Sequence, residues 1–106
     1  MMLKALGGEN GEGTTLSLAL AIKYAEANGA TICNLSLGTD TNDKVLYRTM
    51  KKSKMLFIVA AGNGGEDGRG VDIDKKPSYP ASYDLDNIIT VANIKADGTL
   101  SASSDY

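Results

Sequence analysis

Apolar residues recur at helical spacing along the first third of the chain. They are Leu16, Leu20, Tyr24 and Ala27, with Leu18, Ala21, Ile22 and Ala25 filling the adjoining face. This period predicts a largely buried helix that begins at Thr14 or Thr15 and ends at Asn28. A second helix is expected over residues 42–53, where the lysines face water. The residues expected to face a sheet from this second helix are Val45, Leu46, Thr49 and Met50.

Three further runs, rich in β-branched and apolar residues, predict strands. They cover residues 31–36, 55–61 and 88–94. The run 55–61 is apolar without alternation, which is typical of a parallel strand covered on both faces. Helix-like and strand-like segments alternate, and this order predicts an α/β fold with a parallel sheet and crossover helices. Asp97 and Gly98 predict a turn, after which residues 99–103 are expected to begin a last short strand.

A stretch of about 26 residues rich in glycine and aspartate separates the last two long strands and contains both prolines. It is expected to form a long loop over the carboxyl edge of the sheet. Loops of this length in compact domains usually have a function, and open parallel sheets bind ligands beyond the carboxyl ends of their strands. Gly38 and Asn63 are expected at two such ends.

Composition narrows the classes of partner. The chain is 42% hydrophobic and 23% charged, as is ordinary for one small globular domain or part of a larger one. A net charge of −2 argues against a nucleic-acid partner, which requires a clustered basic surface. No stretch approaches the roughly 20 apolar residues that span a bilayer, so no membrane partner is expected. Cys33 is the sole cysteine, which excludes an internal disulfide.

Four segments together resemble the subtilisin-like serine proteases (subtilases, the peptidase S8 family). They are the helix 21–30 with the following strand I-C-N-L-S-L-G at 32–38, F-I-V-A-A-G-N at 57–63, Y-P-A-S-Y at 79–83 and I-I-T-V-A at 88–92. Their order and spacing agree with the family over nearly the whole chain. Residues 1–106 are therefore identified as the central part of a subtilase catalytic domain. The fold that this implies is subtilisin-like, a Rossmann-like three-layer α/β architecture of which the chain is a partial domain.

The resemblance implies an endopeptidase that hydrolyses peptide bonds through an acyl-enzyme. Asn63 would supply the side-chain amide that stabilises negative charge on the carbonyl oxygen. Ser36, Leu37 and Gly38 would present a backbone edge to a peptide or protein substrate, and Gly11 and Gly13 would lie at a second edge. The walls of the pocket for the residue before the scissile bond would be Ala60, Ala61, Gly62, Ser78, Tyr79, Pro80 and Ala81. The small Ser78, near the base, implies that this pocket accepts a medium or large apolar residue.

The chain lacks catalytic residues that the family requires. It contains no histidine, and the segments that carry the triad aspartate, histidine and serine are absent. The chain alone is therefore predicted to be inactive, because an oxyanion hole alone leaves only a small residual acceleration. The remainder of the catalytic domain is an expected partner, and uncovered surfaces favour self-association. The alternative is a noncatalytic peptide-binding or assembly module with a degenerate subtilase fold. A nucleotide-binding domain is disfavoured, since residues 8–13 lack dinucleotide spacing.

No firm cofactor is expected. Clustered oxygens in the long loop would allow calcium in the parent protein, against the alternative of a solvated acidic loop. The residues concerned are Glu66, Asp67, Asp72 and Asp74. The resemblance favours a secreted protein, with the cytoplasm as the alternative because the family has intracellular members.

Overall fold

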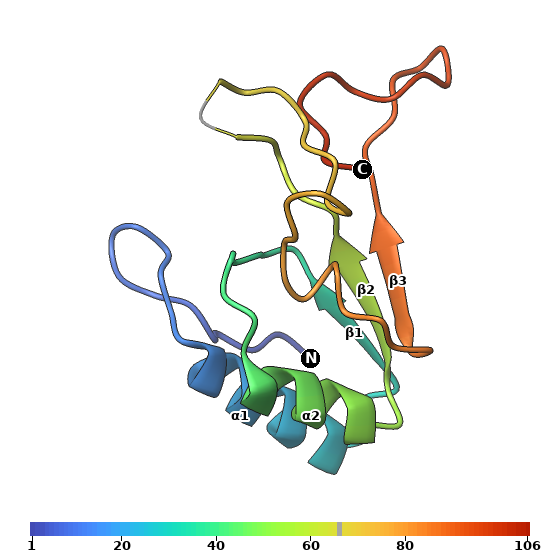
Figure 1. The fold of residues 1–106 in the computed structure, drawn as a ribbon. Coiled ribbons are helices and arrows are strands. Elements are labelled where there is room, and N and C mark those ends of the chain that lie inside the picture. Colours follow the sequence, from blue (N-terminus) through green and yellow to red (C-terminus); the bar gives the residue numbers. More distant parts are fainter. Residues whose placement is uncertain (66) are drawn as a thin grey trace.

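The computed structural model describes residues 1–65 and 67–106 as two helices and three strands. The helices are α1 (Thr15–Ala27) and α2 (Lys44–Lys52), and the strands are β1 (Ile32–Leu35), β2 (Leu56–Ala60) and β3 (Ile88–Val91). The strands form one parallel sheet in the order β1-β2-β3 (Figure 1). This confirms the α/β fold with a parallel sheet. Neither helix of the described residues is long and apolar enough to cross a membrane.

Side-chain caps explain where both helices begin. Before α1, the Thr14 hydroxyl accepts a hydrogen bond from the Ser17 N–H (3.0 Å), and the Ser17 hydroxyl accepts one from the Thr14 N–H (3.1 Å). Before α2, the Asp43 carboxylate accepts from the backbone N–H groups of Val45 (2.8 Å) and Leu46 (2.9 Å). Such caps satisfy donors that have no partner within the helix. The other Asp43 oxygen accepts from the Thr15 hydroxyl (2.8 Å), so Asp43 also joins the starts of the two helices.

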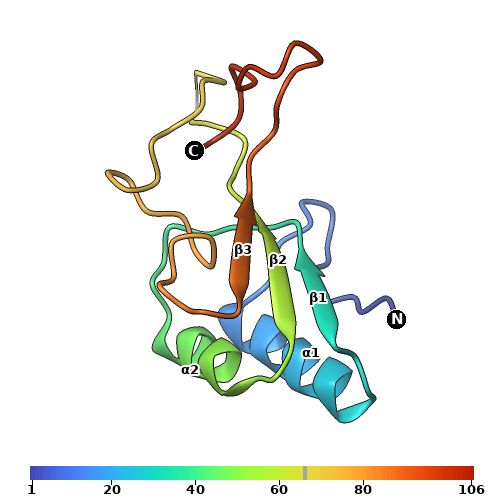
Figure 2. The ribbon, with the colours of Figure 1, turned by 90° about the vertical axis from the view of Figure 1, so that its right-hand side faces the viewer.

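The hydrophobic core lies between the helices and one face of the sheet. Phe57 and Val59 of β2 are completely buried in a single cluster with residues of both helices. The members of that cluster from the helices are Leu18, Ile22, Ala25, Leu46 and Met50. The two helices lie side by side (Figure 2). The described residues thus supply the sheet and one helical layer of the expected three-layer fold.

The opposite face of the sheet is apolar and exposed. Ile32 of β1 is 62% exposed, and Ile89 and Val91 of β3 are 49% and 48% exposed. The strand register places Leu56, Ile58 and Ala60 of β2 beside them, because neighbouring residues in a register row share a face. Apolar residues of the run 55–61 thus point to both faces of the sheet, which is why the run shows no alternation of apolar and polar residues. Within the described residues, helices bury only one of these two faces.

Several details of the helices and strands differ from expectation. Leu16, Leu20 and Tyr24 are each more than half exposed, because α1 packs through one stripe only. That stripe is Leu18, Ala19, Ile22 and Ala25. Val45 is also exposed, since Leu46 and Met50 already fill the core side of α2. The last short strand expected over residues 99–103 does not form, and one isolated antiparallel bridge, Ile94 to Leu100, flanks the confirmed turn at Gly98.

The segments that follow β2 and β3 extend beyond the carboxyl ends of the strands (Figures 1 and 2). They pair with each other through the backbone. The N–H of Gly70 donates to the carbonyl of Ala102 (2.8 Å), and that of Tyr106 donates to the carbonyl of Val71 (3.1 Å). The N–H of Ile73 donates in turn to the Tyr106 carbonyl (2.8 Å). The end of the chain is thereby fixed against the long loop, at the edge of the sheet where Asn63 lies.

Candidate functional site

Two backbone hydrogen bonds join the segment after β1 to the segment around Tyr79. The N–H of Thr39 donates to the carbonyl of Tyr79 (2.9 Å), and the N–H of Tyr79 donates to the carbonyl of Thr39 (2.7 Å). The Tyr79–Pro80 peptide bond is cis. Next to this bridge, a Cβ atom on Gly38 would lie 3.0 Å from the Ser78 hydroxyl oxygen. Glycine at position 38 therefore allows the two segments to approach closely.

The backbone of residues 36–38 is available for pairing. Among residues 1–65 and 67–106, the N–H and C=O groups of Ser36, Leu37 and Gly38 have no backbone hydrogen-bond partner. Beyond them, Thr39 pairs with Tyr79, so the unpaired stretch is held at both ends. An unpaired backbone edge is the feature to which an extended peptide adds as a further strand.

Two cavities meet at this edge and share Leu37, Gly38 and Thr39 in their walls. The first, which we call the helix-side cavity, has a volume of about 350 Å³ and reaches the start of α1. The second, the Asn63 cavity, has a volume of about 460 Å³ and lies at the carboxyl ends of β1 and β2. Together they form a hollow along the unpaired edge, where open parallel sheets bind their ligands.

Most of the residues expected in the site line one of these cavities. The helix-side cavity is lined by Gly11, Gly13, Leu37, Gly38 and Tyr79 from the expected set. The Asn63 cavity is lined by Ser36, Leu37, Gly38, Ala60, Gly62, Asn63 and Ser78. Ala61, Pro80 and Ala81 line neither cavity and are buried behind the walls. They support the site from behind: Ala61 donates to the Val91 carbonyl (2.9 Å), and the Ala81 carbonyl accepts from the Thr90 hydroxyl (2.8 Å).

Asn63 is exposed at the mouth of its cavity, three residues beyond the end of β2. In the part of the chain that the structure describes, no hydrogen bond occupies its side-chain amide. Two N–H donors of that amide are therefore available to an oxygen in the cavity. A free amide donor beside an unpaired backbone edge is an arrangement that can stabilise charge developing on a carbonyl oxygen.

An aromatic cluster supports the Tyr79 wall. The rings of Tyr79 and Tyr83 lie 4.9 Å apart between centroids, and those of Tyr47 and Tyr83 lie 5.2 Å apart, edge to face. The Tyr83 hydroxyl donates to the carbonyl of Asp43 (2.9 Å), and the Asn42 amide donates to the Tyr79 hydroxyl (3.2 Å). Burial raises the pKa of Tyr83. The wall of the cavity is thus attached to the start of α2.

Four residues of the Asn63 cavity were not expected from the sequence: Thr39, Asp40, Gly64 and Asp105. The Asp105 carboxylate packs against Gly62, where a Cβ atom would collide with it. Its Oδ1 accepts from the N–H of Val71 (2.8 Å), and its own N–H donates to the Gly62 carbonyl (3.2 Å). No local signal marks Asp105, because its contacts are with residues far away in the sequence.

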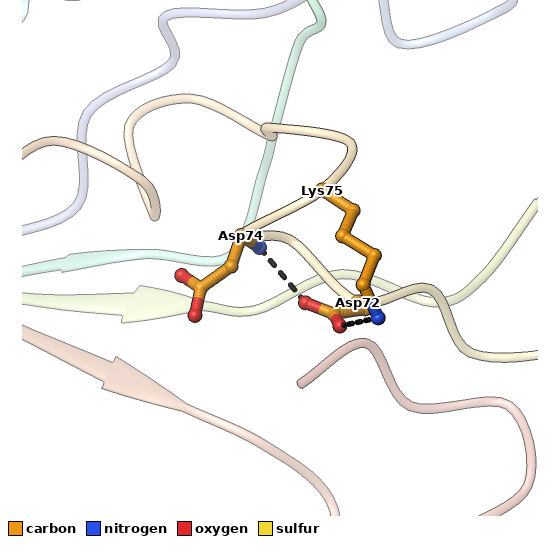
Figure 3. Close-up of polar contacts among 3 residues, drawn as sticks. All are labelled: Asp72, Asp74 and Lys75. Atoms are coloured by element: carbon orange, nitrogen blue, oxygen red, sulfur yellow. Dashed lines mark hydrogen bonds and ion pairs between the residues drawn. The ribbon is translucent and has the colours of Figure 1, made fainter.

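Among residues 1–65 and 67–106, the acidic side chains of the long loop do not converge on a cation site. Asp72 is in an ion pair with Lys75 (2.8 Å) and also accepts from the backbone N–H of Asp74, while the Asp74 carboxylate points away from it (Figure 3). The hydrogen bond from Lys75 lowers the pKa of Asp72. Asp67 accepts from the Arg69 N–H (3.1 Å). No three carboxylate, thiol or imidazole groups converge in the described ranges, and Glu66 lies outside them. Asp67, Asp72 and Asp74 therefore do not form a calcium site within the described residues.

Comparison with known proteins identifies the family. The model of the subtilase family, Peptidase S8, matches residues 1–106. The chain is 32% identical over 108 residues to the major intracellular serine protease of Bacillus subtilis, covering 99% of this chain and 32% of that protein. It is 33% identical over 93 residues to the minor extracellular protease Epr of the same species, covering 88% of this chain and 14% of that protein.

A solved structure agrees with the sequence relatives. The prenylagaramide maturation protease PagA superposes with a TM-score of 0.75 at 26% identity, over 96% of this chain and 36% of that one. The chain thus spans about a third or less of the length of the proteins it matches. The family model covers the whole chain, and the resemblance in its four segments is confirmed: the chain belongs to the subtilase family.

Proposed function

We propose that residues 1–106 are the central part of the catalytic domain of a subtilisin-like serine endopeptidase, and that they supply its oxyanion donor and substrate cleft. One observation carries the proposal: the uncommitted Asn63 amide and the unpaired backbone of residues 36–38 line one cavity at the carboxyl ends of β1 and β2. The nucleophile, its histidine base and the orienting aspartate come from the remainder of the catalytic domain.

In this proposal a peptide substrate lies extended along Ser36, Leu37 and Gly38 and pairs with their free backbone groups. Gly11 and Gly13, across the helix-side cavity, provide the second edge. When the nucleophile attacks the peptide carbonyl, the Asn63 side-chain N–H donates to the oxygen as it gains negative charge. This donor favours the transition state over the bound substrate, so it raises turnover more than affinity.

The test is Asn63→Ala in the full protein that contains this chain. We expect kcat to fall with little change in KM, because the lost interaction forms mainly in the transition state. The size of the effect is known from subtilisin itself, a member of the same family, in which removal of the oxyanion asparagine costs about a hundred- to a thousandfold in kcat. Asn93→Ala is the matched control, since Asn93 is exposed and lies outside both cavities.

The second candidate is a noncatalytic peptide-binding or assembly module. The free edge at residues 36–38 favours it as well, because that edge binds a peptide without any triad. A full protein that binds peptides but hydrolyses none of them would select this candidate and reject the protease. The 106-residue chain alone is expected to be inactive under both proposals.

Two further expectations for the parent protein remain predictions. The family resemblance favours secretion, with the cytoplasm as the alternative, and the names of the relatives select neither, since one is extracellular and another intracellular. Calcium in the parent protein also stays a prediction, because among the described residues Asp72 is paired with Lys75 and the Asp74 carboxylate points away from it (Figure 3).

A further inference from the structure

The Asn63 cavity contains two carboxylates, Asp40 and Asp105, for which the proposed oxyanion and backbone roles have no use. They come from different parts of the chain, one after β1 and one near the end of the chain. No lysine or arginine of the described residues lines this cavity. The one ion pair within residues 1–65 and 67–106 joins Lys75 to Asp72, so neither cavity carboxylate has a cationic partner in that part of the chain.

Asp105 is held in place while one of its oxygens stays available. The residue is only 7% exposed, and its Oδ1 accepts from the Val71 N–H (2.8 Å). Its Oδ2 packs beside Gly62, a residue of the cavity wall, and receives no hydrogen bond from the described part of the chain. This oxygen keeps contact with solvent, because no buried side-chain oxygen of the described residues lacks a hydrogen-bond partner. It is therefore open to a donor that enters the cavity.

Asp40 lies at the exposed side of the same cavity. One of its oxygens accepts from the Thr41 hydroxyl (3.3 Å), which leaves the negative charge uncompensated. Two carboxylates in one concave site raise the local concentration of positive groups. An apolar side chain bound there would instead remove water from Asp105 and offer no partner in return.

We propose that the Asn63 cavity binds the side chain of the substrate residue before the scissile bond, and that this residue is lysine or arginine. Asp105 determines this preference. The inference rests on the proposed function. The cavity of about 460 Å³ has the size of a small ligand site. Glycine at positions 38 and 62 lets Ser78 and the Asp105 carboxylate approach the cavity wall closely. Ser78 alone led to an expectation of apolar residues, and the same experiment decides between the two preferences.

The experiment uses the full protein and a panel of fluorogenic peptides that differ only before the scissile bond, with lysine, arginine, norleucine, leucine or phenylalanine there. Norleucine has an unbranched apolar chain in place of the lysine stem and its charge. We expect kcat/KM to be at least about tenfold higher for lysine than for norleucine, because a hydrogen bond to a charged group discriminates by roughly 10- to 100-fold.

Asp105→Asn keeps an acceptor for Val71 and removes the charge. It should lower the lysine-to-norleucine ratio by about 10- to 100-fold. Asp40→Asn, at an exposed position that does not threaten folding, should lower the same ratio by a smaller factor. Asp74→Asn, which removes the same charge from the loop outside the cavity, should leave the ratio unchanged. Circular dichroism checks that each variant is folded.

A folded enzyme that prefers leucine, phenylalanine or norleucine, with a ratio unaffected by Asp40→Asn, overturns this inference and leaves the proposed protease intact. A folded full protein that cleaves no member of the panel overturns the proposed protease, and this inference with it. The enzyme could also prefer lysine or arginine and lose this preference equally in Asp74→Asn and Asp40→Asn. That result would attribute the preference to overall charge and reject the role of the cavity.

Discussion

The Asp105 carboxylate packs against the backbone of Gly62 in the wall of the Asn63 cavity. Gly62 has a φ of 131°, a backbone angle that residues with a side chain rarely adopt. The Asp105 carboxylate also fills the space that a Cβ atom at this position would need. Two independent restrictions therefore require glycine here. The same contact holds residue 105 against the wall of the Asn63 cavity.

Gly62→Ala should lower the free energy of unfolding by about 2–3 kcal/mol, since strain at φ and displacement of Asp105 add. Gly98→Ala is the matched control, because Gly98 has a φ of 83° and open space around it. It should cost only about 1 kcal/mol, from backbone strain alone. Denaturant titration measures both values, and equal losses would show that Asp105 does not pack on Gly62.

Asp43 predicts a pH dependence of stability. Hydrogen bonds from the Leu46 N–H, then from the Thr15 hydroxyl, lower its pKa below the ordinary value of 3.8. A lowered folded-state pKa stabilises the protein above the unfolded pKa, and this stabilisation is lost as pH falls through the folded value. Asp43→Ala should thus lower the denaturation midpoint at pH 7, and the difference from wild type should shrink as pH falls below about 3.8. Asp86→Ala, an exposed acidic control, should show no such convergence.

At the scale of the elements, α2 has one side in the core and the other in solvent. Leu46 and Met50 are completely buried against the sheet, while Val45, one position away from Leu46, is 51% exposed. Successive helix positions are turned by about 100°, and this turn carries Val45 out of the stripe that faces the core. Asn87 adds a polar anchor: its amide donates to the carbonyls of Met50, Ser53 and Met55.

Substitutions on the two sides of α2 should have very different effects. Leu46→Ala should lower the free energy of unfolding by about 2–5 kcal/mol, because it removes buried methyl groups and leaves a cavity. Val45→Ala should change it by less than about 0.5 kcal/mol, as is usual for surface positions. Chemical denaturation of both variants makes the comparison. Similar losses would place Val45 in the core and contradict the observed orientation of α2.

At the scale of the whole molecule, the described residues leave two apolar surfaces uncovered. One is the sheet face with Ile32, Ile89 and Val91, and the other is the outer stripe of α1 with Leu16 and Leu20. Contiguous exposed apolar surface marks a site of association. We propose that the remainder of the catalytic domain covers these surfaces in the parent protein and that copies of the isolated chain associate through them.

The 106-residue chain on its own should therefore form concentration-dependent oligomers in size-exclusion chromatography with light scattering. Lysine at positions 89 and 91, introduced as Ile89→Lys and Val91→Lys, should reduce this association, since charge on a sheet face opposes stacking. The control pair is Asn10→Lys and Asn93→Lys, which adds two lysines at exposed polar positions. Association that both pairs reduce equally would reflect net charge and not the apolar face.

Much of the fold was determined locally and is therefore readable from the sequence. The Thr14 cap and the apolar period define α1 to within one residue, and the β-branched apolar runs identify all three strands, with β3 ending earlier than expected. The order of motifs was enough to indicate the family. These signals are local because caps, periods and turns involve residues a few positions apart.

The orientation of the elements and the electrostatics of the site were decided only by tertiary structure. Residues 55–61 are uniformly apolar, so nothing in them says that Phe57 and Val59 face the helices while Ile58 faces outward. Likewise, no local pattern places Asp105 beside Gly62. The physical reason is the same in both cases. Burial and charge pairing depend on which distant segments meet, and only the folded chain brings those segments together.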